Sequence, residues 1–320
     1  MKISLITPAG KQLKNGNRTT AMRWARLLRR VGHQVHVTND YDGRAVDLLI
    51  ALHAWHSAKA VQRYRCQAPK GPLVVGLGGT DVNTFLKSDR QITLNAMKAA
   101  DALICLHDLV GEALPPALWG RLNVVRQSAT PLSATRVPSK RHFDICVIGH
   151  LRDEKDPFRA ALAARQMPNN SSLRVIHLGK ATTAKFAKRA AKEMARNFRY
   201  YWRGEVPGWR VRREFAKTHA MVISSVQEGG ANVVSEALVA GVPIIASDIA
   251  GNIGLLGRDY PGYYAVGDTG ALAKLLHQAE AEPAFLNTLA SQGRRLATLF
   301  SPVREQAALE CIVNSVTQPR

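Results

Sequence analysis

The sequence has little of what marks secreted, membrane-spanning or metal-binding proteins. Four cysteines occur among 320 residues, and none stands in a CxxC or Cys/His ligand spacing. This scarcity excludes a disulfide framework and a structural zinc site, and it predicts buried, reduced thiols. No apolar run approaches the roughly 20 residues of a membrane span, and the run Ile3–Ile6 is too short for a signal sequence. We therefore expect a cytoplasmic protein. The cysteines are Cys66, Cys105, Cys146 and Cys311.

Acidic and aromatic residues are also scarce, so the chain is strongly basic. It contains 24 Asp and Glu against 44 Lys and Arg, a formal net charge of +20, and 6% aromatic residues. Such a charge attracts polyanions: nucleic acid, anionic lipid or small phosphorylated molecules. The basic residues are spread over several predicted helices and do not interleave with aromatics, as single-strand nucleic-acid binding requires. Charge alone therefore does not select the partner.

Short runs of Val, Ile and Leu alternate with segments of helical period along the whole chain. Because the strand-like runs are continuously apolar, we expect them to be buried on both faces, in parallel sheets covered by helices. The length predicts two domains of about 150 residues each. The predicted strands are Lys2–Thr7, Gln34–Thr38, Val46–Leu52, Leu73–Leu77, Ala102–Leu106, Leu122–Val125, Asp144–Ile148, Leu173–Leu178, Ala220–Ser224 and Val242–Ala246.

A polar segment with two prolines, Ser128–His142, separates the two series of strands and predicts a linker. The expected organisation is α/β, with a doubly wound Rossmann-like domain over residues 1–135 and a second one over residues 136–300. The two would face a central cleft. A helix in residues 301–320 is expected to cross back to the first domain by fold analogy.

The stretch Ser224–Asp248 predicts a phosphate site in the second domain. A strand ends in a loop that contains Gly229 and Gly230, and a helix begins near Ala231 or Asn232. Glycine backbone can approach a ligand closely, and a helix N-terminus offers unpaired N–H groups to a diphosphate. Glu228 and Glu236 flank this helix start. Carboxylates repel phosphate but accept hydrogen bonds from sugar and ribose hydroxyls, which favours a sugar nucleotide. The alternative is that Glu228 caps the helix and the other carboxylate is a solvated helix residue.

EGGANVVSEALVAGVPIIASD resembles the E-x7-E signature of retaining glycosyltransferases of the GT-B fold, most like family 4. GHLRDEKDP (Gly149–Pro157) and RGEVPGWRVRREFAKTHAMVISS (Arg203–Ser225) resemble two further motifs of that family, in order and spacing. The resemblance covers the second domain. It implies the GT-B fold, a nucleotide-sugar donor and no metal cofactor.

The resemblance also implies a role for each matching residue. Lys155 matches the lysine that binds the diphosphate, Glu228 the carboxylate that faces the donor sugar, and Glu236 the one that holds the ribose. The usual clamp arginine is replaced by His150, and Arg152 follows two residues later. We expect Arg152 to reach the phosphates, and with Lys155 to stabilise the leaving diphosphate. The remaining donor-binding candidates are Arg203, Gly204, Gly229, Gly230, Ala231 and Asn232. The Asp40–Asp42 pair predicts a turn rather than a metal site.

Three polar clusters follow strands of the first domain: NGNR, ALHAWHS and GLGGTD. The carboxyl ends of parallel strands share one edge of a sheet, so we expect these clusters to meet there and contact a ligand. Taken singly, a histidine is usually structural and Asn-Gly marks a turn. The acceptor-binding candidates are Asn15, Gly16, Asn17, Arg18, His53, Gly79, Thr80 and Asp81, and His53 is also a catalytic candidate.

Together with the Arg-rich helix RWARLLRR, these clusters look like the selenosugar synthases of selenoneine biosynthesis. That resemblance implies transfer of N-acetylglucosamine or glucose from a UDP-sugar onto selenophosphate, which forms a C–Se bond and releases UDP. Gly78 stands where that subfamily has a threonine before GTD. Two alternatives remain: a GT-B enzyme acting on a lipid or other small acceptor, with peripheral membrane contact, and a nucleic-acid-binding protein on a degenerate GT-B scaffold.

Overall fold

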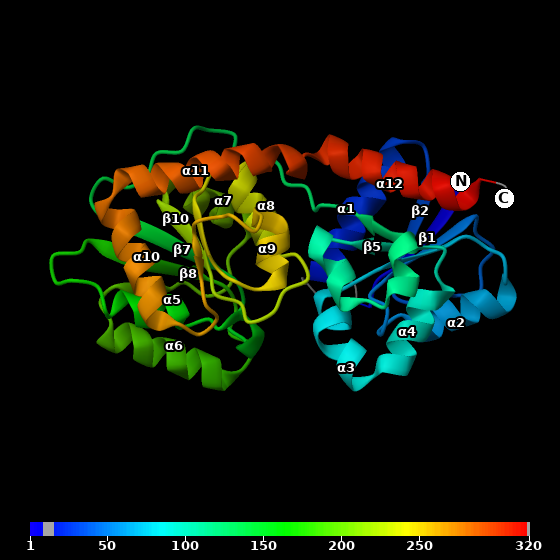
Figure 1. The fold of residues 1–320 in the computed structure, drawn as a ribbon, viewed down its shortest axis with the longest axis horizontal. Helices are drawn as coiled ribbons and strands as arrows, with labels where there is room; N and C mark the ends of the chain where they lie inside the picture. The colour runs from blue at the N-terminus through cyan, green and yellow to red at the C-terminus, as the bar shows by residue number, and fades with distance from the viewer. Residues whose placement is uncertain (9–15, 319–320) are drawn as a thin grey trace. The chain divides into compact units, whose positions relative to one another are not determined.

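The computed structural model describes residues 1–8 and 16–318 (Figure 1). The chain forms two compact units. Unit 1 comprises Met1–Ser128 together with Ser301–Arg320, and unit 2 comprises Ala129–Phe300. The chain thus leaves unit 1 at Ser128, seven residues before the boundary expected from the sequence. The chain returns to unit 1 at Ser301, where the C-terminal helix begins.

Unit 1 is built on a six-stranded sheet in the order β2-β1-β3-β4-β5-β6, in which every neighbouring pair is parallel. The order reverses beside β1, as in a doubly wound sheet. The strands are β1 (Lys2–Ile6), β2 (Gln34–Thr38), β3 (Leu48–Leu52), β4 (Leu73–Gly76), β5 (Ala102–Cys105) and β6 (Leu122–Val124).

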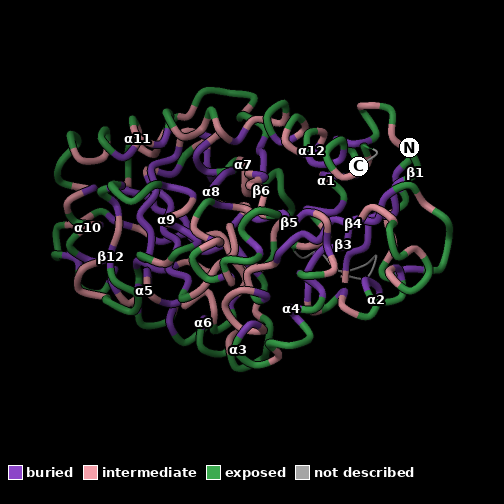
Figure 2. Tube along the Cα trace, turned by 45° about the vertical axis from the view of Figure 1, so that its right-hand side comes forward, coloured by how far each residue is buried: buried purple, intermediate pink, exposed green. Residues whose placement is uncertain are grey.

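Helices cover both faces of this sheet. Side chains of a strand alternate between faces: Ile50 packs with α1 (Gly16–Arg30) and α12 (Pro302–Thr317), whereas Leu49 packs with α2 (Ala58–Gln67) and α4 (Arg90–Ala99). The strands are therefore buried on both sides, while the outer faces of the helices are exposed (Figure 2). A π-helical turn η1 (Asp81–Phe85), the short helix α3 (Leu86–Ser88) and the 3-10 turns η2 (Asp108–Ala113) and η3 (Pro116–Arg121) complete unit 1.

The C-terminal helix α12 is joined to unit 1 by a buried carboxylate. Ser301 caps the helix, its Oγ accepting from the Arg304 N–H at 3.3 Å. Glu305 is buried in the first turn and accepts hydrogen bonds from Trp24 Nε1 at 2.9 Å, from Arg23 Nε at 2.9 Å and from the Ser128 N–H at 2.9 Å. This carboxylate therefore connects α12 with α1 and with the point where the chain leaves unit 1.

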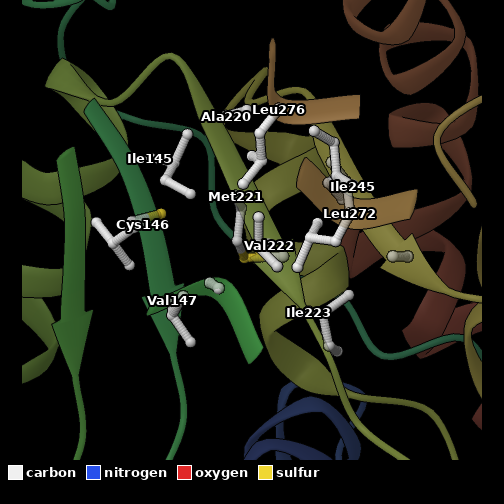
Figure 3. Packing of buried hydrophobic residues seen from close by; sticks show 14 of the residues in the cluster. Ile145, Cys146, Val147, Ala220, Met221, Val222, Ile223, Ile245, Leu272 and Leu276 are labelled. Atoms are coloured by element: carbon white, nitrogen blue, oxygen red, sulfur yellow. The ribbon is translucent and has the colours of Figure 1, made fainter. Parts of the chain in front are cut away.

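Unit 2 repeats the architecture with a parallel sheet in the order β12-β11-β10-β7-β8-β9. The strands are β7 (Phe143–Ile148), β8 (Leu173–Leu178), β9 (Tyr200–Trp202), β10 (Ala220–Ile223), β11 (Ile244–Ser247) and β12 (Tyr263–Tyr264). The helices and helical turns are η4 (Asp153–Lys155), α5 (Arg159–Ala164), α6 (Ala184–Arg196), α7 (Gly208–Lys217), α8 (Asn232–Val239), α9 (Ala250–Leu256), α10 (Thr269–Ala281), α11 (Pro283–Ala297) and η5 (Thr298–Phe300). Figure 3 shows the apolar side chains of β7, β10 and β11 packing with those of α10.

The predicted α/β, doubly wound architecture is confirmed, and the ten predicted strands form with ends that differ by at most two residues. Two short strands, β9 and β12, were not predicted. Both are rich in aromatic residues and lie at sheet edges. They are too short to show a period in the sequence, and only pairing with a neighbour orders them.

Residues 128–142 form neither helix nor strand in the structure. Arg136 nevertheless fixes this segment to unit 2, because its guanidinium donates to the carbonyl oxygens of Phe215, Thr218 and Gly241 at 2.5 to 3.0 Å. Within the part of the chain that the structure describes, we find no helix long and apolar enough to cross a membrane.

Candidate active site

Four loops of unit 2 leave neighbouring strands at one edge of its sheet. They follow β7, β8, β9 and β10, which are adjacent in the order β10-β7-β8-β9. Between the loops after β7 and β10 lies a small, solvent-open pocket. Its lining comprises the ends of β7 and β10 and, beyond them, Gly149, His150, Lys155, Pro157, His177, Ser224 and Ser225. Of the donor residues predicted from the sequence, His150 and Lys155 line this pocket.

An ion pair joins the two main predicted motifs. The Lys155 ammonium contacts Glu228 Oε1, and the same oxygen accepts a hydrogen bond from Ser225 Oγ at 2.6 Å. The side chains of the pair are 19% and 11% exposed, so both are partly shielded but reachable from solvent. A cation and a carboxylate in contact at a pocket edge can exchange partners with a ligand that carries both anionic and hydroxyl groups.

Hydrogen bonds to backbone groups hold the loops after β7 and β10 against each other. Ser224 Oγ donates to the carbonyl oxygens of Lys155 at 3.1 Å and Asp156 at 2.9 Å. The Val226 N–H donates to Glu154 O at 2.9 Å. Asp156 has a φ of 40°, in the left-handed region that few non-glycine residues adopt. The position of Lys155 is thus set by contacts some 70 residues away in sequence.

The glycines of the loop after β10 allow the backbone of this loop to lie close to the pocket. Gly230 has a φ of 118°, which strongly favours glycine. The following residue, Ala231, is the N-cap of α8 and has no side chain that could bind the N–H groups of the first turn. Those groups and the positive end of the helix dipole are suited to an anion. On the other side, a Cβ at Gly251 of α9 would lie 2.5 Å from Glu228 O, so glycine lets α9 approach this loop.

His150, which replaces the expected arginine, accepts a hydrogen bond at Nδ1 from the Lys180 N–H at 3.1 Å. Burial lowers its pKa, with further lowering by the nearby cations, Arg152 among them. A neutral ring that accepts at Nδ1 carries its proton on Nε2 and can donate from there. Arg152 is half-exposed and lies 3.8 Å from Glu154. The loop thus offers a neutral donor at the pocket and a solvent-exposed cation beside it.

His177 was not among the predicted site residues, yet it lines the pocket. It is buried on β8, with Nε2 3.1 Å from Gly149 O and Nδ1 3.0 Å from the Tyr200 hydroxyl. Burial lowers its pKa to about 4, so the ring is neutral, donates from Nε2 to Gly149 O and accepts from Tyr200. Its signal in the sequence is the single histidine in the mostly apolar run LRVIHL. It holds the glycine from which the β7 loop departs.

The other donor candidates lie on the same loops and helix. Glu236 is exposed on α8, and Asn232, the first residue of that helix, is half-buried. Arg203 is exposed after β9, with its guanidinium 5.6 Å from the Tyr201 ring centre, and Gly204 has a φ of 69°. Their roles as ligand contacts stay predictions.

In unit 1 the structure brings together His53, Thr80 and Asp81, at the ends of the adjacent strands β3 and β4. Asp81 is fully buried and accepts hydrogen bonds from three backbone N–H groups, those of Ala54, Trp55 and Gly78, at 2.8 to 2.9 Å. Its Oδ1 lies 2.8 Å from His53 Nδ1. The His56 N–H also points at Nδ1, at 3.2 Å. Because the carboxylate is the closer and charged partner, we place the imidazole proton on Nδ1, and Nε2 then accepts from Thr80 Oγ1 at 2.7 Å.

His53 has a φ of 73°, a conformation that costs a non-glycine residue on the order of 1–3 kcal/mol. The Asp81 network supplies the contacts that hold it. Beside it, Trp55 and Phe85 stack at 4.1 Å between ring centres, and His56 is exposed at their edge. Sequence reasoning did not predict this aromatic cluster, because Phe85 comes from the π-helical turn after the GGTD segment.

The first acceptor cluster is described only in part. Gly16, Asn17 and Arg18 form the start of α1, which follows β1, the neighbour of β3. Gly79 is half-buried beside Thr80. Asn15 lies outside the described residues.

In the Asp40–Asp42 segment, Asp40 contacts Arg63, and Asp42 accepts from the Arg44 N–H at 3.1 Å. In residues 1–8 and 16–318 no three His, Cys, Asp or Glu side chains gather as metal ligands would.

Comparison with known proteins agrees with this geometry. The family model described as glycosyl transferases group 1 matches residues 133–296, just over half of the chain and nearly all of unit 2. The chain belongs to this glycosyltransferase family. A Xenopus tropicalis protein, glycosyltransferase 1 domain-containing protein 1, is 22% identical over 275 residues, which cover 77% of this chain and 79% of that protein.

Solved structures extend the similarity to both units. A sucrose-phosphate synthase from Thermosynechococcus elongatus matches with a TM-score of 0.81 and 15% identity, covering 98% of each chain. Anabaena Alr3699/HepE, solved in complex with UDP and glucose, matches with a TM-score of 0.76 and 16% identity, covering 98% of this glycosyltransferase and all of that chain. At these identities the similarity shows the fold, and the predicted GT-B fold is confirmed.

Proposed function

We propose that this glycosyltransferase transfers a hexose, N-acetylglucosamine or glucose, from a UDP-sugar to a small anionic acceptor, releasing UDP without a metal ion. The acceptor we propose is selenophosphate. The observation that carries the donor half is the Lys155–Glu228 pair at the pocket edge, beside the open N-terminus of α8. A UDP-sugar presents a diphosphate and sugar hydroxyls side by side, which are the groups that this pair would bind.

The pair gives each substrate group a partner. When the donor binds, the Lys155 ammonium would move from Glu228 to the diphosphate, and the released carboxylate would accept from a sugar hydroxyl, with Ser225 holding its other contact. The C1–O bond to the diphosphate breaks, and both electrons leave with UDP. Lys155, the α8 N–H groups and Arg152 would stabilise the growing negative charge, the task that a metal ion performs in other enzymes.

The neighbours support a uridine nucleotide as donor. Alr3699/HepE has been solved with UDP, with UDP and glucose and with UDP-glucose, and the pneumococcal O-GlcNAc transferase GtfA with UDP and GlcNAc. These proteins share the fold with this chain. We infer the nucleotide from this support together with the donor motifs.

The acceptor half rests on unit 1 and on the resemblance of its three clusters to selenosugar synthases. Selenophosphate is already ionised, so its selenium can form the C–Se bond without giving up a proton and no general base is needed. His53 suits a positioning role, since its two ring nitrogens are engaged by Asp81 and Thr80. Arg18 would supply positive charge to the acceptor.

Measuring the release of UDP tests both the proposed donor and the proposed acceptor. The purified chain is incubated with a panel of nucleotide sugars, with and without selenophosphate, in the presence of EDTA, and UDP and the selenosugar are quantified. We expect UDP release from UDP-N-acetylglucosamine or UDP-glucose to rise at least about tenfold with selenophosphate. Transfer to another acceptor alone would refute the selenium assignment and keep the donor site. Activity that needs an added divalent cation would refute the metal-free mechanism.

A further inference from the structure

One helix of unit 2 presents a single row of positive charge to solvent. The row lies on α6 and comprises residues three or four positions apart, all exposed. At 100° per residue these side chains fall within an arc of about 100°, and they extend over about 16 Å of helix. We call them the α6 cationic row: Lys185, Lys188, Arg189, Lys192 and Arg196.

The acidic residue of α6 pairs with one member of the row, Arg196, and leaves the other four cations unneutralised. Glu193 is buried, and its carboxylate binds Arg165, Arg196 and Asn197. Arg196 stays half-exposed, and the Arg189 guanidinium lies 4.2 Å from the Phe158 ring centre. The three lysines of the row form neither an ion pair nor a cation–π contact in the described structure. Like charges three or four residues apart destabilise a helix, so an anionic surface would relieve an existing repulsion.

The remainder of this face is apolar. The residues exposed between the cations include Ala191 and Ala195, with no amide or hydroxyl side chain among them. Just after the helix, Phe198 is 74% exposed, and the Arg199 guanidinium lies 4.4 Å from its ring centre. The opposite side of α6 packs into unit 2 through Ala190, Phe186 and Met194, so the row cannot turn inward. The face is a straight cationic edge, and an exposed aromatic ring follows two residues after its last cation in the chain.

We propose that the α6 cationic row docks this protein on an anionic phospholipid surface, with Phe198 entering the headgroup region. Lysines near an anionic bilayer gain electrostatic free energy, and an exposed apolar side chain adds to the binding. Nucleic acid fits less well. Binding a single strand requires several stacked aromatics, and the one exposed ring beside this row suits a headgroup layer better than a phosphate backbone. This inference does not depend on the proposed donor or acceptor.

Vesicle co-sedimentation of the full chain tests the proposal. The probes are phosphatidylcholine vesicles with and without 30% phosphatidylglycerol at low salt, and the variant is K185E/K188E/K192E. The matched control is K59E/K70E/K98E, which changes three exposed lysines of unit 1 by the same total charge. We expect the α6 variant to lose about 100-fold or more of the partition constant and the control to lose less than about fivefold, since each cation near the surface contributes roughly fivefold. F198S should lose about fivefold.

The outcomes separate the explanations. Binding of the wild type that requires phosphatidylglycerol, disappears in high salt and fails only in the α6 variant supports the proposal. Equal losses in the two triple variants would assign the binding to net charge and overturn it. The proposal would also be overturned if the wild type does not bind vesicles, whether or not the row binds a duplex oligonucleotide. Circular dichroism and unchanged UDP release would show that the variants are folded.

Discussion

The two units share one architecture but place their charged groups in opposite ways. In unit 1, Asp81 is fully buried and is engaged by three backbone N–H groups and by His53. In unit 2, Lys155 and Glu228 lie at the edge of a solvent-open pocket, bound to each other and to one serine. Both arrangements occur at the carboxyl ends of parallel strands, and both came from polar clusters visible in the sequence.

This difference shows what each site can do. A buried carboxylate that binds backbone fixes the shape of its loops and is costly to disturb. An ion pair at a pocket edge, with side chains 19% and 11% exposed, can exchange either partner for a group of a ligand. Substitution of Asp81 should therefore act first on stability, and substitution of Lys155 first on catalysis.

The largest effect is expected from Lys155→Met. Removing the cation that we propose for the leaving diphosphate should lower kcat/KM about 10³-fold, or about 4 kcal/mol of transition-state stabilisation, with the midpoint of urea unfolding changed less than by Asp81→Ala. Initial rates of UDP release measure it. Lys180→Met, which removes an exposed lysine near the same loop, is the control and should stay within about threefold. A large loss of stability in Lys155→Met would remove the contrast between the units.

Asp81→Ala should lower the free energy of unfolding by about 3 kcal/mol, because it leaves three buried N–H groups and His53 without their acceptor. Urea denaturation followed by circular dichroism gives the value, with unit 1 expected to unfold first. Asp42→Ala, whose carboxylate is half-exposed in a surface ion pair, should change stability by less than about 0.5 kcal/mol. If Asp81→Ala unfolds at the wild-type midpoint, the network does not stabilise unit 1.

Acid should destabilise both units through one buried histidine in each. Burial lowers the pKa of His107 in unit 1 and of His177 in unit 2 to about 4, against about 6.5 in an unfolded chain. Between these values the unfolded state binds more protons, so this stability is complete above about pH 6.5 and is lost as the pH falls towards 4. The loss should be about 2 kcal/mol per histidine at pH 5.

Denaturant titrations at pH 8, 6.5 and 5 measure this loss. His107→Gln should flatten the pH dependence of unit 1 and His177→Gln that of unit 2. If a variant shows the same pH dependence of stability as the wild type, the histidine that it lacks does not have a lowered pKa in the folded protein.

The smallest effect is expected from Tyr200→Phe. It removes the hydroxyl that donates to His177 Nδ1, which costs about 1 kcal/mol and loosens the ring that holds Gly149. We expect the KM for the donor to rise up to about fivefold at nearly constant kcat. Tyr201→Phe changes the next residue in the same way and should be neutral. A fall in kcat at constant KM would contradict a positioning role in donor binding.

Local sequence patterns predicted most of the fold. Ten strands and the helix at Ser301–Val316 were visible because buried parallel strands are continuously apolar and helices keep their period. The edge strands β9 and β12 escaped prediction, since two or three residues carry no period. The linker at Ser128–His142 was visible as a loop, but nothing local showed that Arg136 would bind the ends of α7 and α8.

The candidate site divides in the same way. Glycines, carboxylates and lysine in ordered motifs marked the loops that we propose bind the donor, and the carboxyl ends of the strands marked GLGGTD. The sequence showed neither the direction of a side chain nor its partner. Asp81 was predicted as an acceptor ligand, and the structure shows it bound to backbone N–H groups and His53. His177 was missed because one histidine in an apolar strand has no local partner.

The sequence by itself therefore determined the class of fold, the family of the second unit and the loops that could touch a ligand, because these depend on periodicity and on short contiguous motifs. Only the tertiary structure decided which charged groups are buried, which are paired and which can still exchange partners. Those properties depend on contacts between residues far apart in the chain, such as Lys155 with Glu228, His53 with Asp81 and Trp24 with Glu305. Burial sets the energy of such contacts, and it exists only once the sheets and helices have packed.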